Sequence, residues 1–209
     1  MRYVKWVLWI FLILVTFGFF HYTLPQHDIV RITNTEVRRV DFGRNSIFWA
    51  SPDIGTDGTA VNRDVRFIEG FYENGKPMVF RNEDTGFGWP PYFKLDSSNL
   101  QAKARDLVSS NEAPKWVSVT HYGWRNELIS IYPNAVRVKL VDGPDVRIIP
   151  WANIVILLVL AVLALLARRA WKRFWARRVD PVLEDIGEVG EAASDRAKGL
   201  LGWLKGLRG

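Results

Sequence analysis

The segment IIPWANIVILLVLAVLALLARRAWKRFWARR, residues 148–178, decides how the chain is organised. Eleven Leu, Ile or Val residues lie between Ile154 and Leu166. Together they favour membrane insertion by about 4 kcal/mol, whereas one central Arg would cost about 3 kcal/mol. Arg168 and Arg169 therefore mark the end of the apolar run. As a helix, residues 148–167 measure roughly 30 Å, the thickness of the hydrocarbon layer, and they predict a transmembrane helix.

A second apolar run occupies residues 1–24 and follows Arg2 and Lys5. A basic start before an apolar stretch is also typical of a cleaved signal peptide. The exit from this run, Gly18–Pro25, contains no small-x-small cleavage pair, however. Aromatic residues at both ends match the two membrane interfaces. We expect an uncleaved N-terminal transmembrane anchor.

The charges predict how the chain crosses the membrane. Residues 25–150 carry 16 basic and 16 acidic side chains, so the net charge of +6 lies entirely outside them, with +2 before the first apolar run and +4 after the second. Basic flanks of transmembrane helices face the cytoplasm. We therefore expect both termini in the cytoplasm and the central segment in the periplasm of a bacterial inner (plasma) membrane. The same distribution argues against nucleic acid as a partner.

Residues 168–179 predict a basic amphipathic helix at the membrane surface, with the lipid bilayer and anionic headgroups as its partners. Its aromatic side chains recur at i, i+3 and i+4, between basic ones. The predicted membrane-surface residues are Arg168, Arg169, Trp171, Lys172, Arg173, Trp175, Arg177 and Arg178. Asp180–Pro181 is expected to end this helix. Residues 180–209 form the predicted cytoplasmic tail.

Residues 25–147 predict a β-rich periplasmic domain. Alternating or β-branched patterns predict strands at 29–33, 36–40, 65–68, 78–80, 116–120, 128–132, 136–141 and 146–149. Residues 71–77 have the turn signals of a hairpin connection. A capping box at Ser98–Gln101 predicts one helix near 98–109. The expected fold is therefore two transmembrane α-helices around an α+β domain with a mainly antiparallel sheet, and cysteine is absent from the whole chain.

The sequence holds few candidates for chemistry. His21 and His27 flank the end of the first apolar run, and Gln26–Asp28 suggests a metal or proton site, but this spacing matches no metal motif. A hydrolase using His121 would need a nucleophile beside it. Ser118, three positions away in a predicted strand, should point to the opposite face. No catalytic residue, metal or cofactor is expected.

An aromatic loop at residues 88–93 is the other candidate. It contains Gly86-x-Gly88 but leads into Trp-Pro-Pro and not into a helix, so no phosphate cradle follows. Such a loop either forms a recognition surface or caps a sheet as a rigid turn. The candidate binding residues are Trp89, Tyr92, His121, Tyr122, Trp124 and Arg125.

The chain resembles the uncharacterised bacterial inner-membrane proteins grouped as domain of unknown function 1523. The resemblance rests on the aromatic first run and on several motifs: His27–Thr33, Arg81–Thr85, Gly88–Phe93, Thr120–Arg125 and Tyr132–Ala135. It covers both apolar runs and the domain between them, and fades after Asp180. It implies two spans around one domain and carries no activity or catalytic residues.

Two functions follow as expectations. The first is a membrane-anchored periplasmic module without enzymatic activity, an accessory, scaffold or assembly subunit that contacts other membrane proteins. The second is a periplasmic ligand-binding or hydrolytic domain that uses the 88–93 loop with His121 and Arg125.

Overall fold

The computed structural model describes residues 2–41, 48–49, 62–88 and 93–181. The chain divides into two units, Met1–Asn153 and Ile154–Gly209. The elements of the first unit are α1 (Arg2–Thr23), β1 (Gln26–Asp41), β2 (Asn62–Phe71), β3 (Pro77–Asn82), α2 (Ser97–Asp106), β4 (Trp116–Tyr122) and β5 (Asn134–Val141). Helix α3 (Trp151–Phe174) begins at the end of this unit and continues into a π-helical turn, Trp175–Val179.

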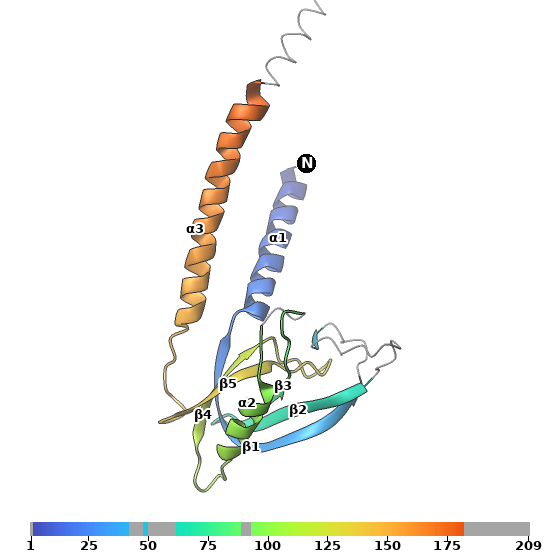
Figure 1. Cartoon of the computed structure of the whole chain (residues 1–209), viewed down its shortest axis with the longest axis vertical. Coiled ribbons are helices and arrows are strands. Elements are labelled where there is room, and N and C mark those ends of the chain that lie inside the picture. The colour runs from blue at the N-terminus through green and yellow to red at the C-terminus, as the bar shows by residue number, and fades with distance from the viewer. Residues whose placement is uncertain (1, 42–47, 50–61, 89–92, 182–209) are drawn as a thin grey trace, which may run out of the picture. The chain divides into compact units, whose positions relative to one another are not determined.

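The five described strands close into a barrel in the order β1-β2-β3-β5-β4, with β1 pairing with both β2 and β4 (Figure 1). The pairs of β1 with β2 and β4, β2 with β3, and β4 with β5 are antiparallel, whereas β3 and β5 are parallel at the Arg81–Asn134 pair. With α2 between β3 and β4, this is the connectivity of the OB-fold, a five-stranded Greek-key barrel. A fold of this kind hosts many functions, so the function has to be argued from the site.

The core of the barrel is mostly aliphatic. Val30, Ile68, Phe80 and Val117 are fully buried in it, and Leu100 and Ala104 of α2 belong to the same buried cluster. Leu100 and Ala104 are four residues apart and lie on one face of the helix. Burial of apolar surface stabilises the folded state by about 25 cal/mol per Å². Because the chain contains no cysteine, the domain depends on this burial and not on disulfides.

The strand predictions at 29–33 and 36–40 are two halves of one long strand, β1. It pairs first with β4 and then with β2, and a bulge falls between Ile32 and Asn34. The residues that face the interior thus change phase along the strand, which explains why two short patterns are visible in the sequence.

Two predicted strands are wrong. Residues 128–132 form a turn closed by an isolated bridge between Asn126 and Ile131. Ser130 has φ 50°, a left-handed conformation that an extended strand excludes. Residues 146–149 are irregular. They follow β5, whose two neighbours in the closed barrel are already β3 and β4, so no free edge is left for them to join.

The predicted capping box of the domain helix is also wrong. Helix α2 begins at Ser97, and its N-cap is Asp96, whose carboxylate accepts a hydrogen bond from the Asn99 backbone N–H at 3.2 Å. Asp96 adopts φ 66°, which places its side chain over the first turn.

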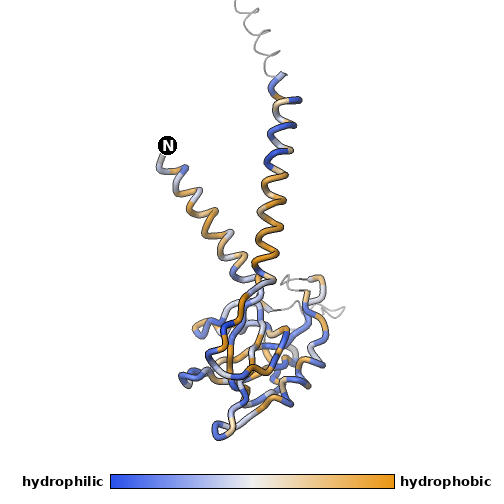
Figure 2. Tube along the Cα trace, turned by 90° about the vertical axis from the view of Figure 1, so that its left-hand side faces the viewer, coloured by the Kyte–Doolittle hydropathy of each residue, from blue (hydrophilic) through white to orange (hydrophobic). Residues whose placement is uncertain are grey.

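Two helical stretches among the described residues are long and apolar enough to cross a membrane, Tyr3–Thr23 and Trp151–Val179. Figure 2 shows the apolar band on each of them. The described helix reaches Asp180 and Pro181, the residues at which its end is predicted. In the π-helical turn the Asp180 N–H bonds the Trp175 carbonyl, five residues back. This wider turn relieves the clash between a proline ring and the carbonyl four residues before it.

Candidate functional site

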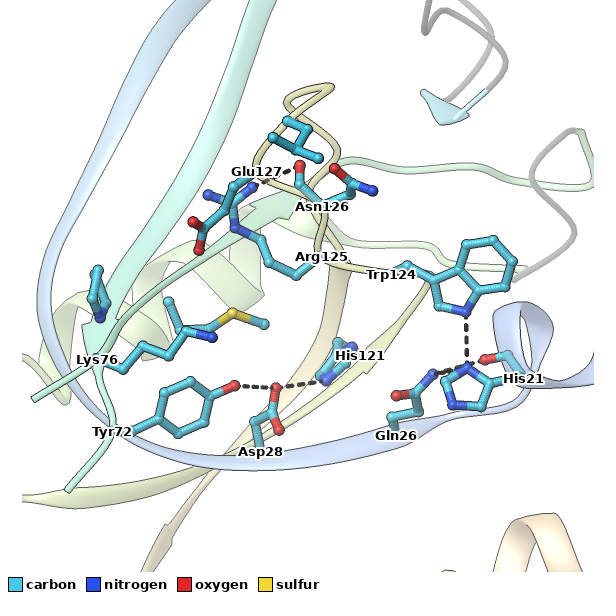
Figure 3. A pocket seen from close by; sticks show the side chains of 14 residues that line it. His21, Gln26, Asp28, Tyr72, Lys76, His121, Trp124, Arg125, Asn126 and Glu127 are labelled. Carbon is cyan, nitrogen blue, oxygen red and sulfur yellow. Dashed lines mark hydrogen bonds and ion pairs between the residues drawn. The ribbon is translucent and has the colours of Figure 1, made fainter. Parts of the chain in front are cut away.

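A polar pocket of about 590 Å³ lies in the barrel beside the end of α1. Its lining comes from four places: the α1–β1 junction, the β2–β3 hairpin, the end of β4, and the loop after β4 (Figure 3). Its polar lining residues include His21, Gln26, Asp28, Tyr72, Lys76 and His121. We call this cavity the Asp28 pocket.

Asp28 is the centre of the pocket. Its Oδ2 atom accepts a hydrogen bond from the Tyr72 hydroxyl at 2.9 Å and lies 3.0 Å from His121 Nε2. Burial by itself would raise the pKa of Asp28, but the hydrogen bond and charge of His121, with the hydrogen bond of Tyr72, hold this pKa below its usual range. The carboxyl group is therefore ionised at neutral pH and can only accept hydrogen bonds, so His121 Nε2 is a donor.

Tyr72 is a fixed donor to this carboxylate. Burial and the negative charge of Asp28 raise the pKa of its hydroxyl, so the phenol keeps its proton at physiological pH. Tyr72 follows directly after β2, and the hairpin turn that begins there is closed by its N–H bonding the Lys76 carbonyl at 3.0 Å. The hairpin predicted at residues 71–77 is thus what brings a phenol to a carboxylate of β1.

His121 is buried, with 4% of its surface exposed. Its ring packs against Phe80 with centroids 5.3 Å apart, and its Nδ1 atom has no hydrogen-bond partner among the described residues. The described lining of the pocket contains no serine, threonine or cysteine. An imidazole without an adjacent nucleophile suits binding and the positioning of Asp28 better than nucleophilic hydrolysis.

A set of contacts joins the pocket to α1. Trp124 Nε1 donates to His21 Nδ1 at 2.8 Å, and the Gly123 N–H donates to the Tyr22 carbonyl at 3.0 Å. The Gln26 side-chain amide donates to the His21 carbonyl at 2.7 Å. The rings of Tyr22 and Trp124 are nearly perpendicular at 5.2 Å. These contacts hold the loop after β4 against the last turn of α1. We call the five residues that make them the junction: His21, Tyr22, Gln26, Gly123 and Trp124.

Arg125 organises the loop after β4. Its Nη1 atom donates to the carbonyls of Asn126 and Ile131, each at 3.1 Å, and its guanidinium lies 4.7 Å from the centre of the Tyr132 ring. A guanidinium in this position closes the turn and stabilises the loop that lines the pocket.

Three of the predicted binding residues therefore meet at one place, because His121, Trp124 and Arg125 all line the Asp28 pocket. Tyr122 is half-buried and is not among the residues that line it, and burial raises the pKa of its hydroxyl. Trp89 and Tyr92 lie outside the described residues.

The sequence does not single out Tyr72 or Lys76. It presents Asp28 only within a possible metal or proton site at Gln26–Asp28, and Asp28 lies in the pocket. His27, next to it in an extended strand, is not among the lining residues. Burial, followed by the charges of His121 and Arg137, lowers the pKa of His27. The described residues contain no group of three metal-ligating side chains.

A second polar cluster is closed to solvent. Lys94 Nζ donates to the side-chain oxygens of Asn82 and Asn134, the latter at 3.3 Å, and Asn82 also donates to Gln101 Oε1 at 2.7 Å. Asn134 exchanges hydrogen bonds with the backbone of Glu83, accepting from its N–H at 3.0 Å and donating to its carbonyl at 2.9 Å. We call these five residues the Lys94 network. It adds side-chain hydrogen bonds to the short β3–β5 pairing and anchors both ends of the segment that carries the 88–93 loop.

The predicted membrane-surface residues lie on α3 and its π-helical turn, where their side chains are exposed. Trp171 stacks beside Phe174 and Trp175, with ring centroids 6.0 and 6.1 Å apart. The aromatic residues thus share one side of the helix, as the i, i+3, i+4 spacing predicts.

Comparison with known proteins now places the chain. A family model described as "Protein of unknown function (DUF1523)" matches residues 1–175. The chain belongs to this family. A relative from Haemophilus influenzae, named "Uncharacterized protein", is 39% identical over 158 residues, which cover 74% of this chain and 86% of the relative. No solved structure matches. The family match covers both apolar helices, the Asp28 pocket and the Lys94 network, and ends inside the basic segment.

Proposed function

We propose that this DUF1523 protein is an accessory, scaffold or assembly subunit of a complex in the bacterial inner membrane. In this proposal both helices span the membrane, both termini are cytoplasmic, and the barrel is a non-catalytic module in the periplasm. The charge distribution supports this topology, because the basic residues flank the apolar runs and the segment between them is neutral.

One observation carries the proposal: the junction makes α1 and the barrel one unit. Trp124 and Gly123 bind the last turn of α1 through hydrogen bonds of 2.8 and 3.0 Å, and only two residues separate α1 from β1. A partner that binds the barrel is thereby fixed relative to the membrane helix. Such coupling is what a scaffold needs, whereas a soluble-type enzyme on an anchor has no use for it.

The barrel also presents apolar side chains to a partner. Phe87 and Phe93 are 90% and 63% exposed, with their ring centroids 5.7 Å apart; Phe87 precedes the 88–93 loop and Phe93 is its last residue. An exposed aromatic pair beside a Pro-rich stretch is typical of protein interaction surfaces. The Lys94 network holds the segment that bears this pair.

The test is purification of the tagged full chain from native membranes in a mild detergent, followed by quantitative mass spectrometry. We expect a membrane protein in stoichiometric amount, and its loss when Phe87 and Phe93 are both replaced by Ser. Leu140→Ser is the matched control, because Leu140 is 55% exposed on β5 and does not line the Asp28 pocket. A chain that purifies without any stoichiometric partner contradicts the proposal.

The topology has its own test, made simple by the absence of cysteine. Ser110→Cys in the exposed loop before β4 should react with a membrane-impermeant maleimide in intact spheroplasts. Arg178→Cys should react only after the membrane is opened. The reverse pattern would overturn the proposed arrangement.

A second candidate function is ligand binding in the periplasm, and the Asp28 pocket favours it. Its carboxylate is ionised and 27% exposed, so it remains accessible to a ligand. Hydrolysis has weaker support, since the described lining contains no serine, threonine or cysteine to act as a nucleophile beside His121, and the Tyr72 hydroxyl donates to Asp28. Replacement of His121 by Ala tests the enzyme directly: an enzyme that relies on it should lose activity and keep its fold.

A further inference from the structure

An apolar groove of about 500 Å³ runs along α1 directly beside the Asp28 pocket. Phe11, Leu14, Gly18 and Tyr22 line it from one face of the helix, and Trp124 closes its end. From Phe11 to Tyr22 the groove follows about 16 Å of helix axis. A Cβ atom at Gly18 would make an ordinary van der Waals contact with the Trp124 ring, at 3.9 Å, so a longer side chain at this position would have to extend into the groove.

Trp124 is the wall shared by the two cavities. It lines the groove with its ring and the Asp28 pocket on the other side, where its Nε1 atom bonds His21. Two successive residues of α1 are divided in the same way, since His21 lines the pocket and Tyr22 lines the groove. The apolar groove on α1 thus meets the Asp28 pocket at the end of the apolar run. A molecule that fills both needs an apolar tail and a polar head, as an amphiphile has.

The charges of the chamber define the head of this amphiphile. Besides its two histidines, the charged lining residues of the pocket are Asp28, Glu127, Lys76 and Arg125. Arg125 is committed to the carbonyls of its own loop, whereas Lys76 has no carboxylate partner among the described residues. Figure 3 shows Lys76 extending over the pocket from the same hairpin as Tyr72. Glu127 lies exposed on the loop after β4, whereas the half-buried Asp28 carboxylate and the Lys76 ammonium favour a head that carries both charges.

We propose that the groove and the Asp28 pocket together bind one zwitterionic phospholipid. Its ammonium group contacts the Asp28 carboxylate, its phosphate contacts Lys76, and one acyl chain follows α1 from Tyr22 toward Phe11. The inference rests on the membrane anchoring and on the second candidate function proposed above, and it does not depend on a protein partner.

Native mass spectrometry of the full chain tests this site. Delipidated protein in detergent is mixed with synthetic phosphatidylethanolamine or phosphatidylglycerol, and the fraction of chains that retain one lipid is measured. We expect about tenfold stronger retention of phosphatidylethanolamine, because phosphatidylglycerol lacks the ammonium group. Asp28→Asn, Lys76→Gln and Gly18→Leu should each reduce this retention about tenfold, the last by filling the groove.

Matched controls separate these effects from general damage. Asp106→Asn removes an exposed carboxylate at the end of α2, and Thr16→Leu adds bulk to α1 at a residue that does not line the groove. Both should bind as the unchanged chain does. Lys76 lies on an exposed turn, so Lys76→Gln gives a result even if Asp28→Asn fails to fold.

Several outcomes overturn the proposal. They are equal retention of both lipids, full retention by Lys76→Gln or by Gly18→Leu, and no retained lipid on the unchanged chain. A lipid that fails to bind while a protein partner still copurifies refutes this site and leaves the accessory function intact.

Discussion

The barrel contains two buried polar clusters that differ in one respect. In the Lys94 network the hydrogen bonds run from side chain to side chain or to backbone, and Lys94, Asn82 and Asn134 are almost fully buried. In the Asp28 pocket one carboxylate oxygen receives two hydrogen bonds, and the side chain stays partly exposed. The polar groups of a closed network form their hydrogen bonds within the fold, whereas those of an open cluster can still form hydrogen bonds with a ligand. Burial of polar groups alone would not have told the two apart.

The largest effect is expected from Asn134→Ala. It removes the Asn134 side-chain hydrogen bonds to the backbone of Glu83 and to the Lys94 ammonium in a buried site. We expect the free energy of unfolding to fall by about 3 kcal/mol. Thermal unfolding of the full chain in detergent measures this, with the exposed Asn111→Ala as control. A loss as small as that of the control would mean that the network does not hold the fold.

The pH dependence of stability should identify Lys94. Burial lowers the pKa of Lys94 to about 7, below its ordinary value. Between pH 7 and the pKa of a free lysine, the unfolded chain binds the extra proton, so the free energy of unfolding should rise with pH by up to about 1.4 kcal/mol per unit. Lys94→Met should remove this rise, and the exposed Lys139→Met should keep it. A rise that persists in Lys94→Met assigns it to another group.

A smaller effect is expected from Tyr72→Phe in the open cluster. It removes one of the two hydrogen bonds to Asp28 and should lower the free energy of unfolding by about 1 kcal/mol at neutral pH. The lowered pKa of Asp28 stabilises the fold above the pKa of a free carboxyl, and this contribution is lost as pH falls through the folded pKa. In Tyr72→Phe the acid loss should therefore begin at higher pH. Unfolding curves at stepwise lower pH measure it, with the exposed Tyr3→Phe as control.

The smallest effect on stability is expected from Lys76→Gln. Lys76 is exposed and has no ion pair among the described residues, so the free energy of unfolding should change by less than about 0.5 kcal/mol. Together with the binding loss expected for the same variant, this would make the Asp28 pocket a site and not a structural cluster. Destabilisation as large as that of Tyr72→Phe would contradict this distinction.

Much of the fold was readable from local patterns. The apolar helices, the strands β2 to β5 and the hairpin after Phe71 all have signals within about ten residues, and local physics decides them. The closure of the barrel was not readable, because it depends on β1 pairing with two strands that lie far apart in the sequence. The pattern at 128–132 predicts a strand where the structure has a turn, because alternation of apolar residues carries no information on the positive φ of Ser130.

The site was readable only in part. His121, Trp124 and Arg125 form a compact motif, and the sequence presents them together. Asp28 contributes its carboxylate from 93 residues away, and the pairing of β1 with β4 brings it to His121. Tyr72 arrives through the hairpin that follows β2. A sequence without aligned homologues carries no signal for such long-range pairs.

The direct passage from α1 into β1 also has a mechanical meaning. A force applied to α1 is transmitted to the barrel at Gln26, the first residue of β1. From there β1 forms hydrogen bonds first with β4 and then with β2 (Figure 1). The hydrogen bonds of antiparallel strands run across the strand direction. Tension along β1 therefore shears many of them at once and does not open them one by one. The barrel is thus joined to α1 through β1, its longest described strand.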